Sequence, residues 1–119
     1  MSPISGKIEQ FYALKPIRFD LLNRFEWVAI PLVQGYSQRL VLHLTPSRDE
    51  AIGPELVLGF EDVRNLRFAA EGLVQPLIEI KDVSAQQWDG VTYEVRDREH
   101  DTIFFLCRDF SALVREATR

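Results

Sequence analysis

The feature that most constrains the fold of this chain is a repeated alternation of apolar and polar residues with a period of two. The alternation recurs at residues 40–45, 56–61, 78–81 and 91–96. In an extended strand, successive side chains point to opposite sides, so this pattern places one face on a core and the other toward solvent. Residues 102–107 (TIFFLC) are apolar at both alternating positions, which predicts a central strand covered on both faces.

A further strand is predicted at residues 27–33 (WVAIPLV), which are rich in aromatic and β-branched residues. Pro31 has no N–H to donate to a ladder, so we expect this strand at a sheet edge. Turn-forming residues at 34–37 and at Asp89-Gly90 separate the predicted strands. Residues 19–25 fit either a strand or a helix.

Helical spacing occurs near both ends of the chain. A short helix is predicted near the N-terminus, where three apolar residues share one face: Ile8, Phe11 and Tyr12. A second is predicted at the C-terminus, with Asp109 as N-cap and four residues at i, i+3, i+4 and i+7: Phe110, Leu113, Val114 and Ala117. The predicted fold is α+β, mainly β: an antiparallel sheet of six or seven strands with one or two short helices, including a C-terminal helix.

Composition restricts the class of protein. The 119 residues are 46% hydrophobic, which supplies a core, and no linker or repeat divides them, so we expect residues 1–119 to form a single domain. The net charge of −4 has no basic surplus of the kind that nucleic-acid binding needs. No apolar run approaches the roughly 20 residues of a membrane span, and no signal-peptide pattern opens the chain. We therefore expect a soluble, cytoplasmic protein without a nucleic-acid or membrane partner.

A row of charged residues at 97–101 (DREHD) lies between two of the predicted strands. Carboxylates beside an imidazole can bind a metal or move a proton. The apolar flanks instead indicate a hairpin, and we interpret the row as its polar turn. The other hypothesis is a small enzyme or metal-binding protein that uses Asp97, Glu99 and His100 of this hairpin.

Other sequence signals give no catalytic, cofactor-binding or metal-binding residues. The single cysteine, Cys107, ends the most apolar strand, where a buried thiol is unreactive. His43 lies inside a strand pattern and is interpreted as a structural residue. No CxxC, HExxH, GxSxG or glycine-rich phosphate loop is present. The sequence therefore favours a non-catalytic protein over an enzyme.

Tyrosine, tryptophan and arginine are the residues that most often anchor protein interfaces. Tyr36, Arg39 and Arg48 lie near predicted loops at one end of the sheet and are our candidate partner-binding residues. Trp27 and Phe25, with Tyr36 beyond the edge strand, would form an exposed aromatic patch. The favoured interpretation, however, places Trp27 and Trp88 in the core.

Residues 77–107 (LIEIKDVSAQQWDGVTYEVRDREHDTIFFLC), preceded by 56–68 (LVLGFEDVRNLRF), resemble a theme in small bacterial domains. In that theme a strand is followed by a turn with a tryptophan, a YxVxDxE strand and a strand ending in FxC. The matching residues are Phe60, Val63, Leu66, Phe68, Ile80, Trp88, Tyr93, Val95, Asp97, Glu99, Phe105 and Cys107. Some such domains are grouped with the immunity proteins of polymorphic toxin systems. The resemblance implies a protein that binds and neutralises a partner, with no catalytic residues to transfer.

The leading hypothesis is therefore a non-catalytic bacterial protein that acts by protein–protein binding, in the manner of an immunity protein. Two alternatives stay open beside it. One is the enzyme or metal protein described above, and the other is a β-sheet domain that binds a small apolar ligand. The sequence also leaves a homodimer open, because sheet edges can pair.

Overall fold

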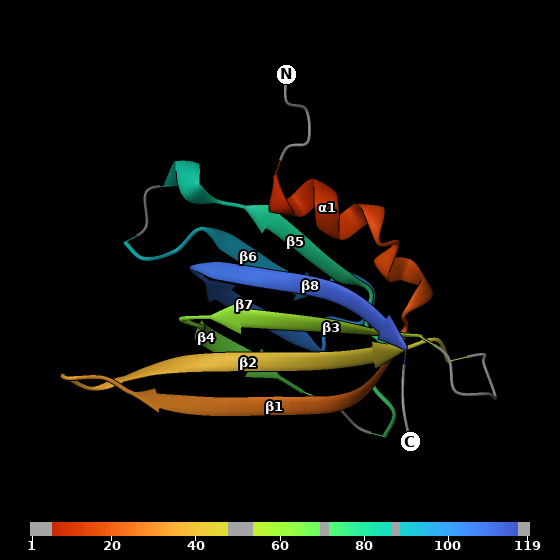
Figure 1. Ribbon diagram of the computed structural model, residues 1–119, viewed down its shortest axis with the longest axis horizontal. Helices are drawn as coiled ribbons and strands as arrows, with labels where there is room; N and C mark the ends of the chain where they lie inside the picture. Colours follow the sequence, from red (N-terminus) through yellow and green to blue (C-terminus); the bar gives the residue numbers. More distant parts are fainter. Residues whose placement is uncertain (1–5, 48–53, 70–71, 87–88, 117–119) are drawn as a thin grey trace.

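The structure is a computed structural model that describes residues 6–47, 54–69, 72–86 and 89–116 (Figure 1). Eight strands form two antiparallel sheets of four strands each. Sheet A has, in order, β1 (Leu21–Pro31), β2 (Tyr36–Thr45), β3 (Pro54–Glu61) and β8 (Asp109–Glu116). Sheet B has, in order, β4 (Arg64–Phe68), β7 (Ile103–Cys107), β6 (Tyr93–Asp97) and β5 (Ile78–Asp82). The helices are α1 (Lys7–Ala13) and two 3-10 turns, η1 (Pro16–Arg18) and η2 (Ser84–Gln86).

The strands predicted from alternation all exist, but the prediction of one sheet of six or seven strands was wrong. The chain leaves sheet A after β3, builds all of sheet B, and returns to sheet A as β8. A period of two identifies a buried face without saying which sheet carries it. The mainly β class and the short N-terminal helix α1 are confirmed.

The predicted C-terminal helix was also wrong, because residues 109–116 form strand β8. Phe110 and Ala112 alternate on the inner face, while Leu113 and Val114, which share the predicted helical face with Phe110, are exposed. β8 pairs with β3 along that strand's whole length. A short isolated helix has little stability of its own, so ladder hydrogen bonds to the open edge of β3 decide the outcome. Ala117 lies outside the described residues.

The two sheets pack face to face through aromatic side chains. Phe60 of β3 meets Phe105 of β7 edge to face, with ring centroids 4.7 Å apart. Tyr93 of β6 meets Phe110 of β8 in the same way at 4.9 Å. The buried cluster takes residues from both sheets and from α1: Phe11, Phe19, Leu40, Leu42, Leu44, Leu56, Leu58, Phe60, Val63, Ile78, Ile80, Val95, Ile103, Phe105, Cys107 and Phe110. These contacts fix which face of each strand points inward.

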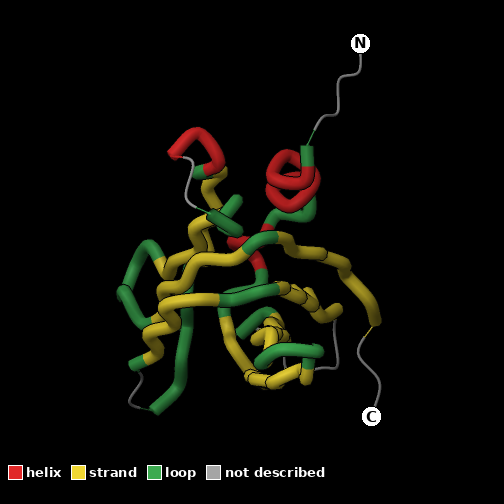
Figure 2. The backbone as a smooth tube through the Cα atoms, turned by 90° about the vertical axis from the view of Figure 1, so that its left-hand side faces the viewer, coloured by secondary structure: helices red, strands yellow, loops and turns green. Residues whose placement is uncertain are grey.

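The two long sides of the sandwich are closed differently. Helix α1 contacts the edge strands β5 and β8, and Figure 2 shows it above the strand layers. Its buried Phe11 enters the core, and the Tyr12 hydroxyl accepts a hydrogen bond from Ile80 N of β5 at 3.1 Å. On the other side, Phe25 of β1 stacks on Phe68 of β4 with centroids 4.6 Å apart. None of the described helices is long and apolar enough to cross a membrane.

Both connections between the sheets lie at one end of the molecule. The β3–β4 and β7–β8 connections are each only a few residues long, and we call them the two corners. The Arg108 N–H donates a hydrogen bond to Glu61 O, at 3.0 Å, which links the two corners. Asp62, whose φ of 55° is positive, pairs with Arg64 at 3.2 Å and with Arg108 at 3.8 Å. One carboxylate therefore joins both corners.

Truncating Phe60 tests the packing between the sheets. Phe60→Ala removes a fully buried ring in contact with Phe105 and should lower the free energy of unfolding by about 3–5 kcal/mol. Urea unfolding followed by circular dichroism measures this change. Leu73→Ala, at a residue 78% exposed, is the control and should stay within about 0.5 kcal/mol of the wild type. Equal effects of the two substitutions would contradict the described core.

Candidate partner-binding surface

The β1–β2 hairpin projects beyond the rest of sheet A. β1 pairs with β2 out to Tyr36, whereas β3 pairs with β2 over Leu40–Leu44. Figure 1 shows this two-stranded ribbon extending past the ends of the other strands. Residues 27–38 contain no Asp, Glu, Lys or Arg, although 27% of the whole chain is charged. We call residues 27–38 the projecting hairpin.

The projecting hairpin exposes large apolar side chains. Leu32 is 55% exposed, Val33 fully exposed and Tyr36 67% exposed. Leu32 N donates to Gly35 O at 2.9 Å, and Gly35 takes the positive φ of 84° that this turn needs. Turns usually carry polar residues, and a grouped apolar surface of this kind is typical of an interaction site.

Trp27 lies in the projecting hairpin, so its expected place in the core was wrong. It shares a face with Leu40, its cross-strand partner, but β1 is an edge strand and the side chain is 42% exposed. Because side chains alternate, Trp27 and Tyr36 lie on the same face of the hairpin. Of the aromatic patch considered from the sequence, Trp27 and Tyr36 are exposed, whereas Phe25 is partly buried against the core and stacked on Phe68. Trp88 lies outside the described residues.

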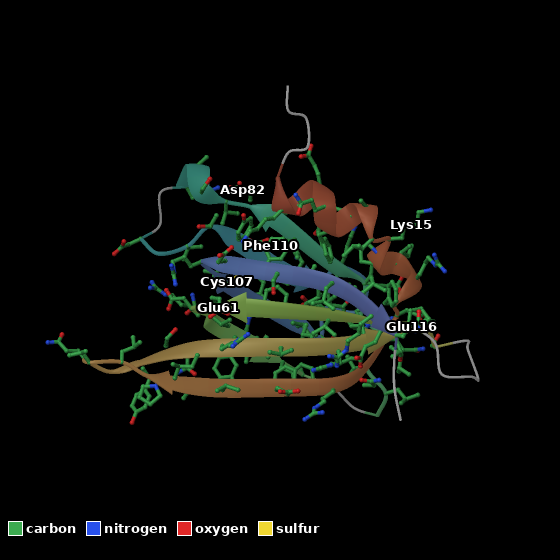
Figure 3. The ribbon with its side chains drawn as sticks, in the orientation of Figure 1. Lys15, Glu61, Asp82, Cys107, Phe110 and Glu116 are labelled. Atoms are coloured by element: carbon green, nitrogen blue, oxygen red, sulfur yellow. The ribbon has the colours of Figure 1, made fainter. Side chains whose placement is uncertain are left out.

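Arg39 lies at the base of the projecting hairpin, on the opposite face from Tyr36. Its Nε is 3.3 Å from Glu61 Oε2, which places it beside the two corner connections. The structure therefore brings two of the three candidate partner-binding residues onto one hairpin, while Arg48 lies outside the described residues. Figure 3 shows Glu61 near the base of this hairpin.

The guanidinium of Arg64 is held in place at the same end. Its Nη1 donates to Asp89 O at 3.0 Å, and its Nη2 pairs with Asp62. Gly90, at φ 74°, leaves room for it, because a Cβ there would lie 2.7 Å from Nη2. Paired charges thus surround the base of an uncharged apolar projection.

His43 belongs to an ionic network that sequence reasoning missed. The imidazole is buried, with Nε2 3.0 Å from Glu26 and Nδ1 3.4 Å from Glu55. Glu26 also pairs with Arg24 at 2.8 Å, and Glu55 with Arg115 at 2.9 Å. This network crosses all four strands of sheet A on its outer face. Only the strand register brings these residues together.

Asp97 organises the turn between β6 and β7. Its buried carboxylate accepts hydrogen bonds from the backbone N–H groups of Leu77, Glu99, His100 and Thr102, at 2.9–3.2 Å, and from Thr102 Oγ1 at 2.6 Å. Glu99 and His100 are exposed in the turn. The interpretation of 97–101 as a hairpin turn is confirmed. Among the described residues, no group of three His, Cys, Asp or Glu side chains can hold a metal ion.

The hydrogen bonds of Asp97 make stability depend on pH. Burial would raise the pKa of Asp97, but the bonds from Thr102, Leu77 and His100 outweigh it and lower that pKa below the ordinary 3.8. A lowered folded pKa means that the stabilisation is present above about pH 4 and is lost as the pH falls through the folded value.

Asp97→Asn should lower the free energy of unfolding by about 2 kcal/mol at pH 7, because an amide replaces a charged acceptor. The difference from the wild type should shrink as the pH falls below about 4. Urea titrations of both proteins between pH 7 and pH 2.5 measure it. A difference that stays constant over this range would show that the Asp97 charge contributes nothing.

Cys107 lies on the inner face of β7. Burial, together with the nearby Asp109, raises the pKa of its thiol to about 12. The native protein should therefore react with a thiol reagent such as DTNB at least about 100-fold more slowly than the urea-unfolded chain. Reaction of the native protein at the unfolded rate would contradict the described burial.

Together the fold and the surface define a mainly β, two-sheet protein with an exposed apolar hairpin suited to contact another protein. A model of the family described as immunity protein PIM8 matches residues 3–113. The chain therefore belongs to the immunity protein PIM8 family, which confirms the resemblance to immunity proteins of polymorphic toxin systems. A search of curated proteins and a search of solved structures each find no match.

Proposed function

We propose that this chain is an immunity protein that binds a toxin protein and neutralises it, with the projecting hairpin as the main contact. Membership of an immunity protein family supports a protein partner. The single structural observation that carries the choice of surface is the run of exposed, uncharged residues at 27–38. In this proposal the protein acts as a single domain, in the cytoplasm, without catalysis of its own.

The projecting hairpin has the composition of an interface anchor. Tyr36 and Trp27 present large rigid rings on one face, and Leu32 and Val33 form the tip. Such residues gain binding energy when a partner removes them from water. Arg39, paired with Glu61 at the base, would lie at the polar rim of the contact. Tyr36 and Arg39, two of the three partner-binding residues predicted from the sequence, thus each have a role in this proposal.

The two alternative functions have less support. The enzyme or metal hypothesis relied on the 97–101 row, where the Asp97 carboxylate is already occupied by hydrogen bonds within the turn. The ligand-binding hypothesis needs space between the sheets, where aromatic side chains from β3, β6, β7 and β8 meet. Neither offers a feature comparable to the projecting hairpin.

The proposal is tested with a candidate toxin domain taken from the genes that neighbour this one in its genome. Leu32→Asp combined with Val33→Asp places two charges at the tip, and we expect the dissociation constant to rise about 30-fold or more. Isothermal titration calorimetry measures it. The matched control, Ile17→Asp with Leu73→Asp, charges two exposed apolar residues elsewhere and should bind as the wild type does.

A growth assay gives a second measurement of the same proposal. Cells that express the toxin domain should grow when they also express the wild-type chain or the control, and should fail to grow with the tip variant. Absence of binding by the wild-type chain would contradict the proposed function. Wild-type affinity of a folded tip variant would contradict the role of the hairpin.

A further inference from the structure

The outer face of sheet A carries an apolar stripe. Strand register places one apolar residue from each strand on this face: Val28 of β1, Val41 of β2, Val57 of β3 and Leu113 of β8. Neighbouring members are either directly opposite or one diagonal step apart, within the usual reach of cross-strand side chains. Leu113 is 50% exposed. We call these four residues the apolar stripe.

Small residues leave the surface beside the apolar stripe free of large side chains. Gly59 is the cross-strand partner of Val41 and of Ser111 on this face. A Cβ at Gly59 would lie 3.1 Å from Ser111 Oγ, so the small Ser111 side chain occupies the space beside Gly59. A partner surface can therefore reach Val41 and Val57 without meeting a large side chain at Gly59.

Paired charges border the apolar stripe on both sides. On one side Arg39 pairs with Glu61, and Lys7 pairs with Asp109. On the other side the partners are joined through His43: Arg24, Glu26, His43, Glu55 and Arg115. Each of these groups has a partner within the protein. The stripe thus offers apolar contact area between two borders whose charges are already balanced.

The apolar stripe is open and continuous with the projecting hairpin. Figure 1 looks onto sheet A with sheet B behind it, and no described element lies in front of this face. Helix α1 contacts β5 and β8 at the side of the sandwich instead. Val28 belongs both to the hairpin and to the stripe. Trp27 and Tyr36 lie on the other face of the hairpin. A partner that binds the tip residues Leu32 and Val33 therefore reaches the stripe through Val28.

We propose that the toxin contact continues from the projecting hairpin along the apolar stripe, and that the toxin presents an uncharged apolar ridge to it. This inference rests on the proposed function and adds the chemistry of the partner surface. Four strands set the length of the ridge at about 14 Å or more, three spacings of about 4.8 Å. An acidic or nucleic-acid partner would need free cations, and the cations that border the stripe are paired.

Because no free charge is used, binding should depend weakly on salt. Charge-steered complexes weaken steeply as ionic strength rises, since screening shortens the reach of each charge. Here the dissociation constant for the toxin domain should change less than about 3-fold between 50 and 500 mM NaCl. A change of 10-fold or more would overturn the uncharged contact.

Leu113→Asp is the direct test. With the toxin domain as probe, we expect the dissociation constant to rise about 10-fold or more, while Leu73→Asp, a matched leucine outside the stripe, should bind as the wild type does. If the Asp variant fails to fold, Leu113→Thr replaces it as the test. Threonine favours strands, and this variant should weaken binding by a smaller factor. Thermal melts confirm that the variants compared are folded.

The outcomes separate this inference from the proposed function. If the hairpin-tip variant loses affinity while the folded Leu113 variants bind normally, the stripe proposal is overturned and the proposed function stands. If the wild-type chain does not bind the toxin domain, both are overturned. Sedimentation that shows a dimer of this chain, dissociated by Leu113→Asp without loss of toxin affinity, would assign the stripe to self-association and overturn the proposal.

Discussion

Phe60 of sheet A packs edge to face against Phe105 of sheet B, and this contact fixes which face of each sheet points inward. These rings, together with Tyr93 and Phe110, hold sheet A against sheet B. Once the inner faces are fixed, alternation assigns every other side chain to an outer face. The register of β1, β2, β3 and β8 then determines which residues meet there, including the ionic network through His43 and the apolar stripe.

The projecting hairpin is exposed because β3, the neighbour of β2 in sheet A, does not pair with this part of β2. β1 and β2 continue beyond the region that β3 covers, so Leu32, Val33 and Tyr36 remain largely exposed in the folded chain. Apolar side chains left in water contribute little to stability and promote association. Their presence in a run without charge is most simply explained by burial in a complex. The family assignment supplies the class of partner.

Sequence reasoning predicted most of the strands, because the alternation of apolar and polar residues that marks a strand lies within a few neighbouring residues. It did not predict the division into two sheets or the strands β4 and β8, since these depend on pairing between residues far apart. Glu55 and Arg115 are an example, joined only by the β3–β8 register. The same limit applies to the candidate site. Tyr36 was found from its residue type, whereas the stripe and the His43 network required the register.

Hydrogen exchange with the toxin domain bound and unbound shows whether the hairpin and sheet A form the contact, because it reports on every strand at once. We expect slower exchange in the complex at residues 27–38, at the adjoining part of β2 and along β8, with sheet B unchanged. Slower exchange confined to β5 and β6 of sheet B, with residues 27–38 exchanging as in the free protein, would contradict it.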